Sequence, residues 1–228
     1  TLPRPRARSE VAQHFHERSC ALHEARGNSV GLASSLNNLA VVKAMQQQFE
    51  AALQDFERSR ALREQLGDRH GMAMSYNNLG FVAYLNSQFA TAEDYYQKSL
   101  AIREAIGDQS GAATTLVNIG SLQVELSEAE AALSLLRGLN LAQRLGMVPV
   151  MLEALVYYAR LMLRQNQPER AATLIGLVAS HPTTNQELRQ QIQPITEELA
   201  ASLSPERLKA CLETGQATPL DDILRTLP

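Results

Sequence analysis

Apolar residues recur along this chain three and four positions apart, which is the spacing of one face of an α-helix. One such series, at positions i, i+3, i+4 and i+7, consists of Tyr76, Leu79, Gly80 and Ala83. A second series begins at Phe89, after a polar break. Because this helical period leaves no place for strands, the pattern predicts an all-α fold.

This pair of helices recurs with a period of 40 residues. Three stretches align without gaps from Gly27, Gly67 and Gly107, and a more divergent fourth begins one residue early, at Gly146. Each glycine can close one helix in the left-handed conformation, and the Asn or Asp that follows the first three can cap the next helix. Short turns make successive helices antiparallel neighbours, so we expect an α-solenoid of stacked helix hairpins.

Other positions keep the same period, and small residues among them let two helix backbones approach. The recurring sets are Leu39, Leu79 and Ile119; Ala40, Gly80 and Gly120; Ala52, Ala92 and Ala132; and Phe56, Tyr96 and Leu136. This pattern resembles tetratricopeptide repeats, in a long 40-residue variant similar to the repeats of kinesin light chains and bacterial multidomain signalling regulators. The resemblance covers roughly residues 10–180. It implies a right-handed superhelix that binds its ligands on the concave face.

The repeats divide the chain into segments. We expect a linker at 1–9, an isolated second helix at 10–26, repeats at 27–66, 67–106, 107–145 and 146–181, and C-terminal capping helices at 182–228. The isolated helix aligns with the second helix of a repeat, so we expect its partner to lie upstream in a longer chain. Its open face would also allow self-association.

The last segment has its own helix signals. A helix is expected from about 186 to 203, with Pro194 kinking or splitting it. Ser204-Pro205 and Thr218-Pro219 are typical helix starts, and Gly215 suits the stop between them. This ending resembles the C-terminal tails of bacterial signal-transducing ATPases and transcriptional regulators.

Composition and charge exclude several function classes. The 228 residues hold 21 Lys+Arg and 24 Asp+Glu, and this net charge of −3 argues against a basic nucleic-acid-binding face. No apolar run is long enough to span a membrane. Two cysteines, Cys20 and Cys211, cannot form a disulfide framework and favour a reducing, cytoplasmic location.

Candidate chemistry is sparse. The Gly-x-x-x-Gly turns recur with the repeat and lack the lysine of a phosphate-binding loop. His14, His16 and His23 do not have metal-ligand spacing, and neither cysteine has a histidine placed by a local signature. We therefore predict no catalytic residues, no cofactor and no metal, and expect that the protein is not an enzyme.

Asparagines inside the first helices are the exception, because Asn is a poor helix former. The resemblance places them on the concave face, beside bulky side chains. The candidate ligand-binding residues are Asn37, Asn38, Met74, Asn77, Asn78, Phe81, Tyr84, Asn118, Tyr157 and Tyr158. Their amides either contact the backbone of a bound peptide or form a ladder that holds neighbouring first helices together. In the fourth repeat, Arg160 stands at the 40-residue phase of the small residue Gly120.

The sequence thus favours a non-catalytic module that binds a polypeptide or small effector in its concave groove. We expect it to be the C-terminal sensor or interaction domain of a larger bacterial signalling or transcriptional regulator. A free-standing adaptor or co-chaperone and a scaffold segment of a larger enzyme are the alternatives.

Overall fold

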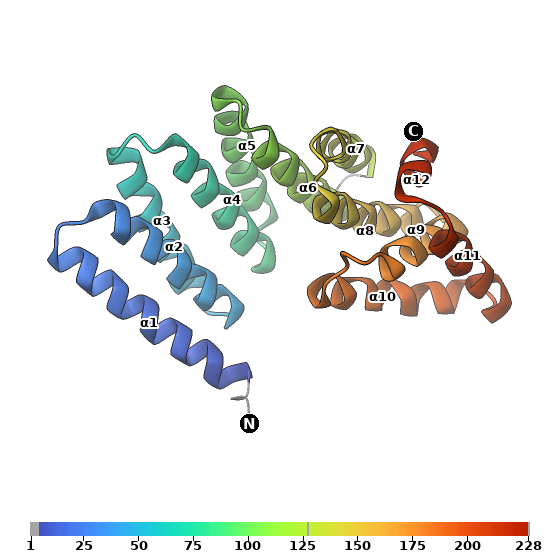
Figure 1. Cartoon of the computed structure of the whole chain (residues 1–228), viewed down its shortest axis with the longest axis horizontal. Helices are drawn as coiled ribbons and strands as arrows, with labels where there is room; N and C mark the ends of the chain where they lie inside the picture. The colour runs from blue at the N-terminus through green and yellow to red at the C-terminus, as the bar shows by residue number, and fades with distance from the viewer. Residues whose placement is uncertain (1–4, 127, 228) are drawn as a thin grey trace. The chain divides into compact units, whose positions relative to one another are not determined.

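A computed structural model describes residues 5–126 and 128–227, and these residues form twelve α-helices and no strand (Figure 1). The helices are α1 (Pro5–Ala25), α2 (Ser29–Met45), α3 (Phe49–Gln65), α4 (Arg69–Leu85), α5 (Phe89–Ile106), α6 (Gln109–Leu126), α7 (Glu128–Arg144), α8 (Val148–Arg164), α9 (Pro168–Ser180), α10 (Gln186–Ser202), α11 (Pro205–Ala217) and α12 (Leu220–Thr226). The all-α fold of stacked helix hairpins is confirmed. The chain forms two compact units, one up to Thr115 and one from Leu116, and the division falls within α6.

The turns between hairpins form as their glycines predict. Gly27, Gly67, Gly107 and Gly146 all have φ between 63° and 72°, the left-handed region that favours glycine. After the first three glycines, the next residue caps the following helix: the Asp68 side chain, for example, accepts the Gly71 N–H at 2.8 Å. Each turn therefore ends one helix and starts the next within three residues.

In α7, the buried positions expected from the 40-residue period are wrong by one residue. Its fully buried residues are Ala131 and Leu135, whereas Ala132 and Leu136, named from the 40-residue period, are only partly buried. The cause is that α7 begins 39 residues after Phe89, the first residue of α5. Losing one residue turns a helix by about 100°, so the preceding residue takes each inward position. Gly146 lies one residue early for the same reason.

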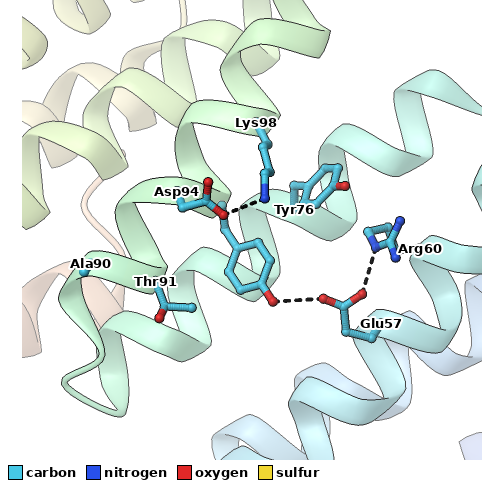
Figure 2. A pocket seen from close by; sticks show the side chains of 8 residues that line it. Glu57, Arg60, Tyr76, Ala90, Thr91, Asp94 and Lys98 are labelled. Carbon is cyan, nitrogen blue, oxygen red and sulfur yellow. Dashed lines mark hydrogen bonds and ion pairs between the residues drawn. The ribbon is translucent and has the colours of Figure 1, made fainter.

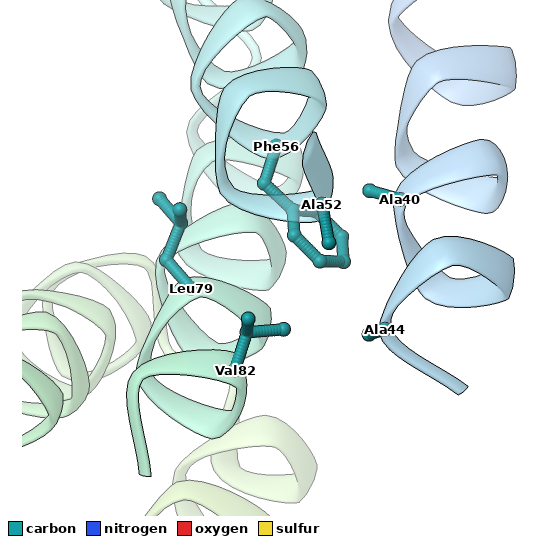
Figure 3. Close-up of a cluster of buried hydrophobic side chains, with 6 residues drawn as sticks. All are labelled: Ala40, Ala44, Ala52, Phe56, Leu79 and Val82. Carbon is teal, nitrogen blue, oxygen red and sulfur yellow. The ribbon is translucent and has the colours of Figure 1, made fainter. Parts of the chain in front are cut away.

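The core of the first unit lies between the hairpins. Phe56 of α3, 1% exposed, packs among Ala40 and Ala44 of α2 and Leu79 and Val82 of α4 (Figure 3). The alanines are small enough to admit this ring between the helices. One interaction therefore joins the hairpin α2–α3 to the next first helix, α4.

Tyr96 fills the equivalent place in the second hairpin. A Cβ atom added at Gly80 would lie 2.7 Å from the Tyr96 ring, closer than a real contact. Gly80 therefore packs against the Tyr96 ring, and Ala92 of α5 is also fully buried. A glycine is required at this crossing because α4 and the tyrosine ring of α5 approach so closely.

Buried arginines fasten the turns, a feature that the apolar pattern does not reveal. Arg63 is 6% exposed and donates to the Gly71 carbonyl oxygen at 2.6 Å. Its equivalent Arg103 pairs with Asp108 at 3.0 Å. Burial raises the pKa of Asp108, but hydrogen bonds from the Gly111 N–H and the Ser110 hydroxyl, together with nearby positive charge, outweigh it and lower that pKa below its usual value.

The two ends of the chain differ from expectation in detail. Helix α1 begins at Pro5, so residues 5–9 are helix rather than linker, while residues 1–4 lie outside the described part. Pro194 does not split α10, which runs through it. Ser204 caps α11 as its sequence predicts, accepting the Arg207 N–H at 3.3 Å.

Gly215 is not the stop between the terminal helices. It lies inside α11 and is buried against α9, where an added Cβ would overlap the Thr173 carbonyl oxygen. On the facing helix, a Cβ at Gly176 would likewise overlap the Leu212 carbonyl oxygen. The pair of glycines brings the α9 and α11 backbones together, and this is how the C-terminal segment attaches to the last repeat.

Candidate interaction surfaces

An uncharged stripe runs along the solvent side of α2 and α4, which contact each other directly. We call it the first-helix stripe, and its residues are Val30, Ser34, Asn38, Val41 and Met45 of α2 and His70, Met74, Asn78, Phe81 and Leu85 of α4. It contains no lysine, arginine or carboxylate among these residues. Met45 is 79% exposed and Phe81 46% exposed. Exposed apolar side chains that recur on two neighbouring helices make this stripe a candidate binding surface for another molecule.

Three of the candidate asparagines connect adjacent first helices. The Asn78 amide donates to the Asn37 side-chain oxygen at 3.1 Å, and the Thr115 hydroxyl donates to the Asn77 side-chain oxygen at 3.2 Å. Asn37 is buried, whereas Asn38 is exposed within the stripe. These hydrogen bonds are what the ladder hypothesis requires, so Asn38 is the amide best placed to meet a ligand.

The aromatic candidates separate into surface and core. Phe81 is exposed, and Tyr84 is half-buried with its ring centroid 5.9 Å from that of Phe89. Tyr157 is half-buried. Tyr158 is only 2% exposed and belongs to the core of the second unit, which leaves it no surface for a ligand.

The one-residue shift explains the fourth repeat. With the shift applied, Tyr158 occupies the core position of Leu79, and Tyr157 occupies that of Asn78. Ala159, fully buried, takes the small-residue position. Arg160 therefore does not replace a packing residue, because it lies at the exposed position of Phe81.

Some of the equivalent positions on α6 and α8 are charged. Glu125 and Arg164 are equivalent to Met45 and Leu85, and their side chains pair at 2.5 Å. Arg160 lies 3.8 Å from the same carboxylate. Half-buried Asn118 lies on the α6 part of this surface. The surface of α6 and α8 therefore differs in charge from the first-helix stripe of α2 and α4.

A polar and aromatic pocket of about 460 Å³ opens on the other side of α4, between α3, α4 and α5 (Figure 2). It is lined by Glu57, Arg60, Tyr76, Ala90, Thr91, Asp94, Tyr95 and Lys98. Tyr76 follows Met74 by two positions, which is about 200° around the helix, so the pocket and the first-helix stripe lie on opposite faces of α4.

Hydrogen bonds and ring contacts order the pocket. The Tyr95 hydroxyl and the Arg60 guanidinium each donate to one oxygen of Glu57, at 2.9 and 2.8 Å. The Tyr76 and Tyr95 ring centroids are 6.1 Å apart. Burial and the hydrogen bond to Glu57 raise the pKa of Tyr95 to about 12, so its hydroxyl keeps its proton at neutral pH.

Sequence reasoning missed this pocket, although the repeat contains a signal for it. Leu36 and Leu116 occupy the position of Tyr76 in the neighbouring repeats and are buried. Asp55 occupies the position of Tyr95 one repeat earlier. Side chains that depart from the repeat pattern are not required by its packing. Tyr76 and Tyr95 both depart from it, and their rings lie together in the pocket.

Helix α1 presents another exposed apolar face. Val11, Phe15 and Leu22 are 52–70% exposed, at helical spacing. Ser19 of α1 contacts Ser35 of α2 at 2.8 Å, just as Ser99 contacts Thr115 two repeats later. The helix thus packs as the second helix of a repeat does. Self-association through its exposed face stays a prediction.

Two further properties concern the described residues as a whole. None of their helices is both long and apolar enough to cross a membrane. Over the same residues, no three His, Cys, Asp or Glu side chains are grouped where they could hold a metal ion.

Comparisons with known proteins agree with the helical repeat. Models described as tetratricopeptide repeat match residues 32–70 and 71–138. No curated protein matches the sequence. Among solved structures, the crystal structure of BtubC (BKLC) from P. vanneervenii is similar, with a TM-score of 0.71, 15% sequence identity, and coverage of 96% of this chain and 92% of that chain. The sequence of residues 32–138 is therefore similar to tetratricopeptide repeats, and the structural likeness supports the same fold along nearly the whole chain.

Proposed function

We propose that this chain is a non-catalytic module that binds a polypeptide through the first-helix stripe. The observation that carries the proposal is the exposed, uncharged surface shared by α2 and α4. Similarity to tetratricopeptide repeats supports it, because helical solenoids present extended binding surfaces. Removing water from an apolar partner and from this surface costs little free energy. A charged group of the partner would instead be buried here without a counter-charge, which is unfavourable. The bound segment is therefore apolar and uncharged where it meets α2 and α4.

We further infer that the module is the C-terminal sensor or interaction domain of a larger bacterial signalling or transcriptional regulator. Support comes from the resemblance of the repeats and of the C-terminal tail to such proteins. A nucleotide-binding motif upstream in the full reading frame would agree with this placement, and its absence would favour the free-standing adaptor. The uncharged stripe counts against an adaptor that clamps a C-terminal carboxylate, since that needs Lys or Arg.

The test uses selection of random 12-residue peptides displayed on phage, with the whole chain as bait. Selected peptides should be rich in apolar residues and poor in charge. Phe81→Glu should lower the affinity of the chain for a selected synthetic peptide by about tenfold or more, because an interface loses about this much when an anchor side chain is removed. Phe81 is already 46% exposed, so the fold should survive the substitution.

Leu133→Glu is the matched control, because Leu133 is 62% exposed on α7 and lies outside the stripe. Its affinity for the same peptide should equal that of the parent chain, and circular dichroism should show full helicity in both variants. Failure to select any apolar, uncharged peptide, or equal binding of the selected peptide by the Phe81 variant, would refute the proposed site.

A further inference from the structure

We propose that the pocket between α3, α4 and α5 is a second binding site, which takes the guanidinium side chain of an arginine in a partner polypeptide. Its two tyrosine rings and two acidic side chains are the groups that recognise an organic cation. The site lies on the face of α4 opposite the first-helix stripe, so it adds to the proposed function and does not depend on it.

The pocket already holds cations of the chain itself. The Arg60 guanidinium carbon lies 5.5 Å from the Tyr76 ring centroid. The Lys98 ammonium lies 6.0 Å from the same centroid and 5.8 Å from that of Tyr95 (Figure 2). The electron-rich ring faces attract positive charge. Lys98 therefore shows where a cation from another molecule would sit.

The charges around the pocket favour a cation over an anion. Arg60 is paired with two carboxylates, Glu57 at 2.8 Å and Glu64 at 2.9 Å, which leaves it little capacity for an added anion. Lys98 is paired with Asp94 at 2.6 Å. Both basic groups of the pocket are thus already paired, whereas the faces of the Tyr76 and Tyr95 rings still attract positive charge.

Lys98 is the group that an incoming cation displaces. Its pair with Asp94 joins residues four apart on α5, with both side chains at least half exposed. Exposed pairs of this kind contribute little stability, so the lysine can swing into solvent. Asp94 and the Tyr95 ring are then free for a guanidinium, whose planar shape suits both a carboxylate and an aromatic face.

The experiment follows the tyrosine ring signals of ¹³C-labelled protein during titration with the tripeptide acetyl-Gly-Arg-Gly-amide. We expect shifts at Tyr76 and Tyr95, with signals assigned from Tyr→Phe variants. The same tripeptide with citrulline, which keeps the shape and lacks the charge, should bind more weakly or not at all. The acidic tripeptide acetyl-Gly-Glu-Gly-amide should leave both signals unmoved.

The decisive measurement is whether Lys98→Met raises or lowers the affinity for the arginine tripeptide. Removing the internal competitor should tighten binding of the arginine tripeptide by about two- to fivefold, the factor that an exposed cation–π contact is worth. Asp94→Asn should weaken binding. Lys209→Met is the matched control, since Lys209 of the second unit is also exposed and pairs with a carboxylate four residues away on its own helix.

Three results would overturn the proposal. They are equal binding of the citrulline tripeptide, stronger binding of the acidic tripeptide, and unchanged or weaker arginine binding by the Lys98 variant. The last two would mean that Lys98 recognises an anion or only supports the fold. Phe81→Glu should leave binding of the arginine tripeptide unchanged, and Lys98→Met should leave binding of the apolar selected peptide unchanged, so the two proposals can fail separately.

Discussion

At the scale of single residues, polar side chains connect the repeats at defined points. Arg63 and Arg103 are almost fully buried, and each is bonded to the turn after its own helix. A buried guanidinium is tolerated only when its donors are paired, so these arginines fix the turn geometry. Asn37 and Asn78 connect adjacent first helices in the same manner.

We predict that the Asn37–Asn78 hydrogen bond stabilises the fold. Asn78→Ala should lower the free energy of unfolding by about 1–2 kcal/mol, because it leaves the buried Asn37 amide without this donor and outweighs the gain in helix propensity. Urea denaturation of Asn37→Ala, Asn78→Ala and the double variant would give the coupling energy. Strict additivity would show that the two amides do not act as a pair, and would return Asn78 to the ligand-binding hypothesis.

At the scale of whole elements, helix crossings depend on glycines and on register. Gly80 admits Tyr96 of α5, and Gly120 admits Leu135 of α7. Gly176 and Gly215 go further, because each faces backbone rather than a side chain that can move. The attachment of α11 to α9 therefore has no room for a single added carbon.

We predict that Gly215→Ala is strongly destabilising. The new methyl group would overlap the Thr173 carbonyl oxygen, and separating the helices should cost about 1–3 kcal/mol or more, despite the better helix propensity of alanine. Thermal unfolding followed by circular dichroism measures the loss. Thr214→Ala, at an exposed neighbouring position of α11, is the control and should change the melting temperature little. A melting temperature that stays the same in both variants would contradict the crossing described here.

At the scale of the whole molecule, stability is built from neighbouring pairs. Among the described helices, most contacts join elements that follow each other along the chain, such as α2 with α3 and α3 with α4. A chain of this kind behaves as a row of units coupled to their neighbours. A destabilising substitution at one end then lowers the stability of that unit and of the neighbours coupled to it.

We predict that Gly215→Ala loosens the chain locally. Hydrogen exchange measured by mass spectrometry should show lost protection in α9, α10 and α11, while α2, α3 and α4 keep theirs. The physical reason is that α11 packs against α9, inside the second unit. An equal loss along the entire chain would instead reveal a single cooperative transition.

The sequence alone determined the helices, the hairpin repeat and the glycine turns, because each depends on local periodicity and on residues within one turn. It also singled out the asparagines inside the first helices. Tertiary structure decided the rest: a single residue lost before α7 moved Tyr158 from the position of Asn78 to the core position of Leu79. Only the fold brought Glu57 of α3, Tyr76 of α4 and Lys98 of α5 around one pocket. Contacts between helices depend on rotation about each axis and on the distance between axes, and a one-dimensional pattern records neither.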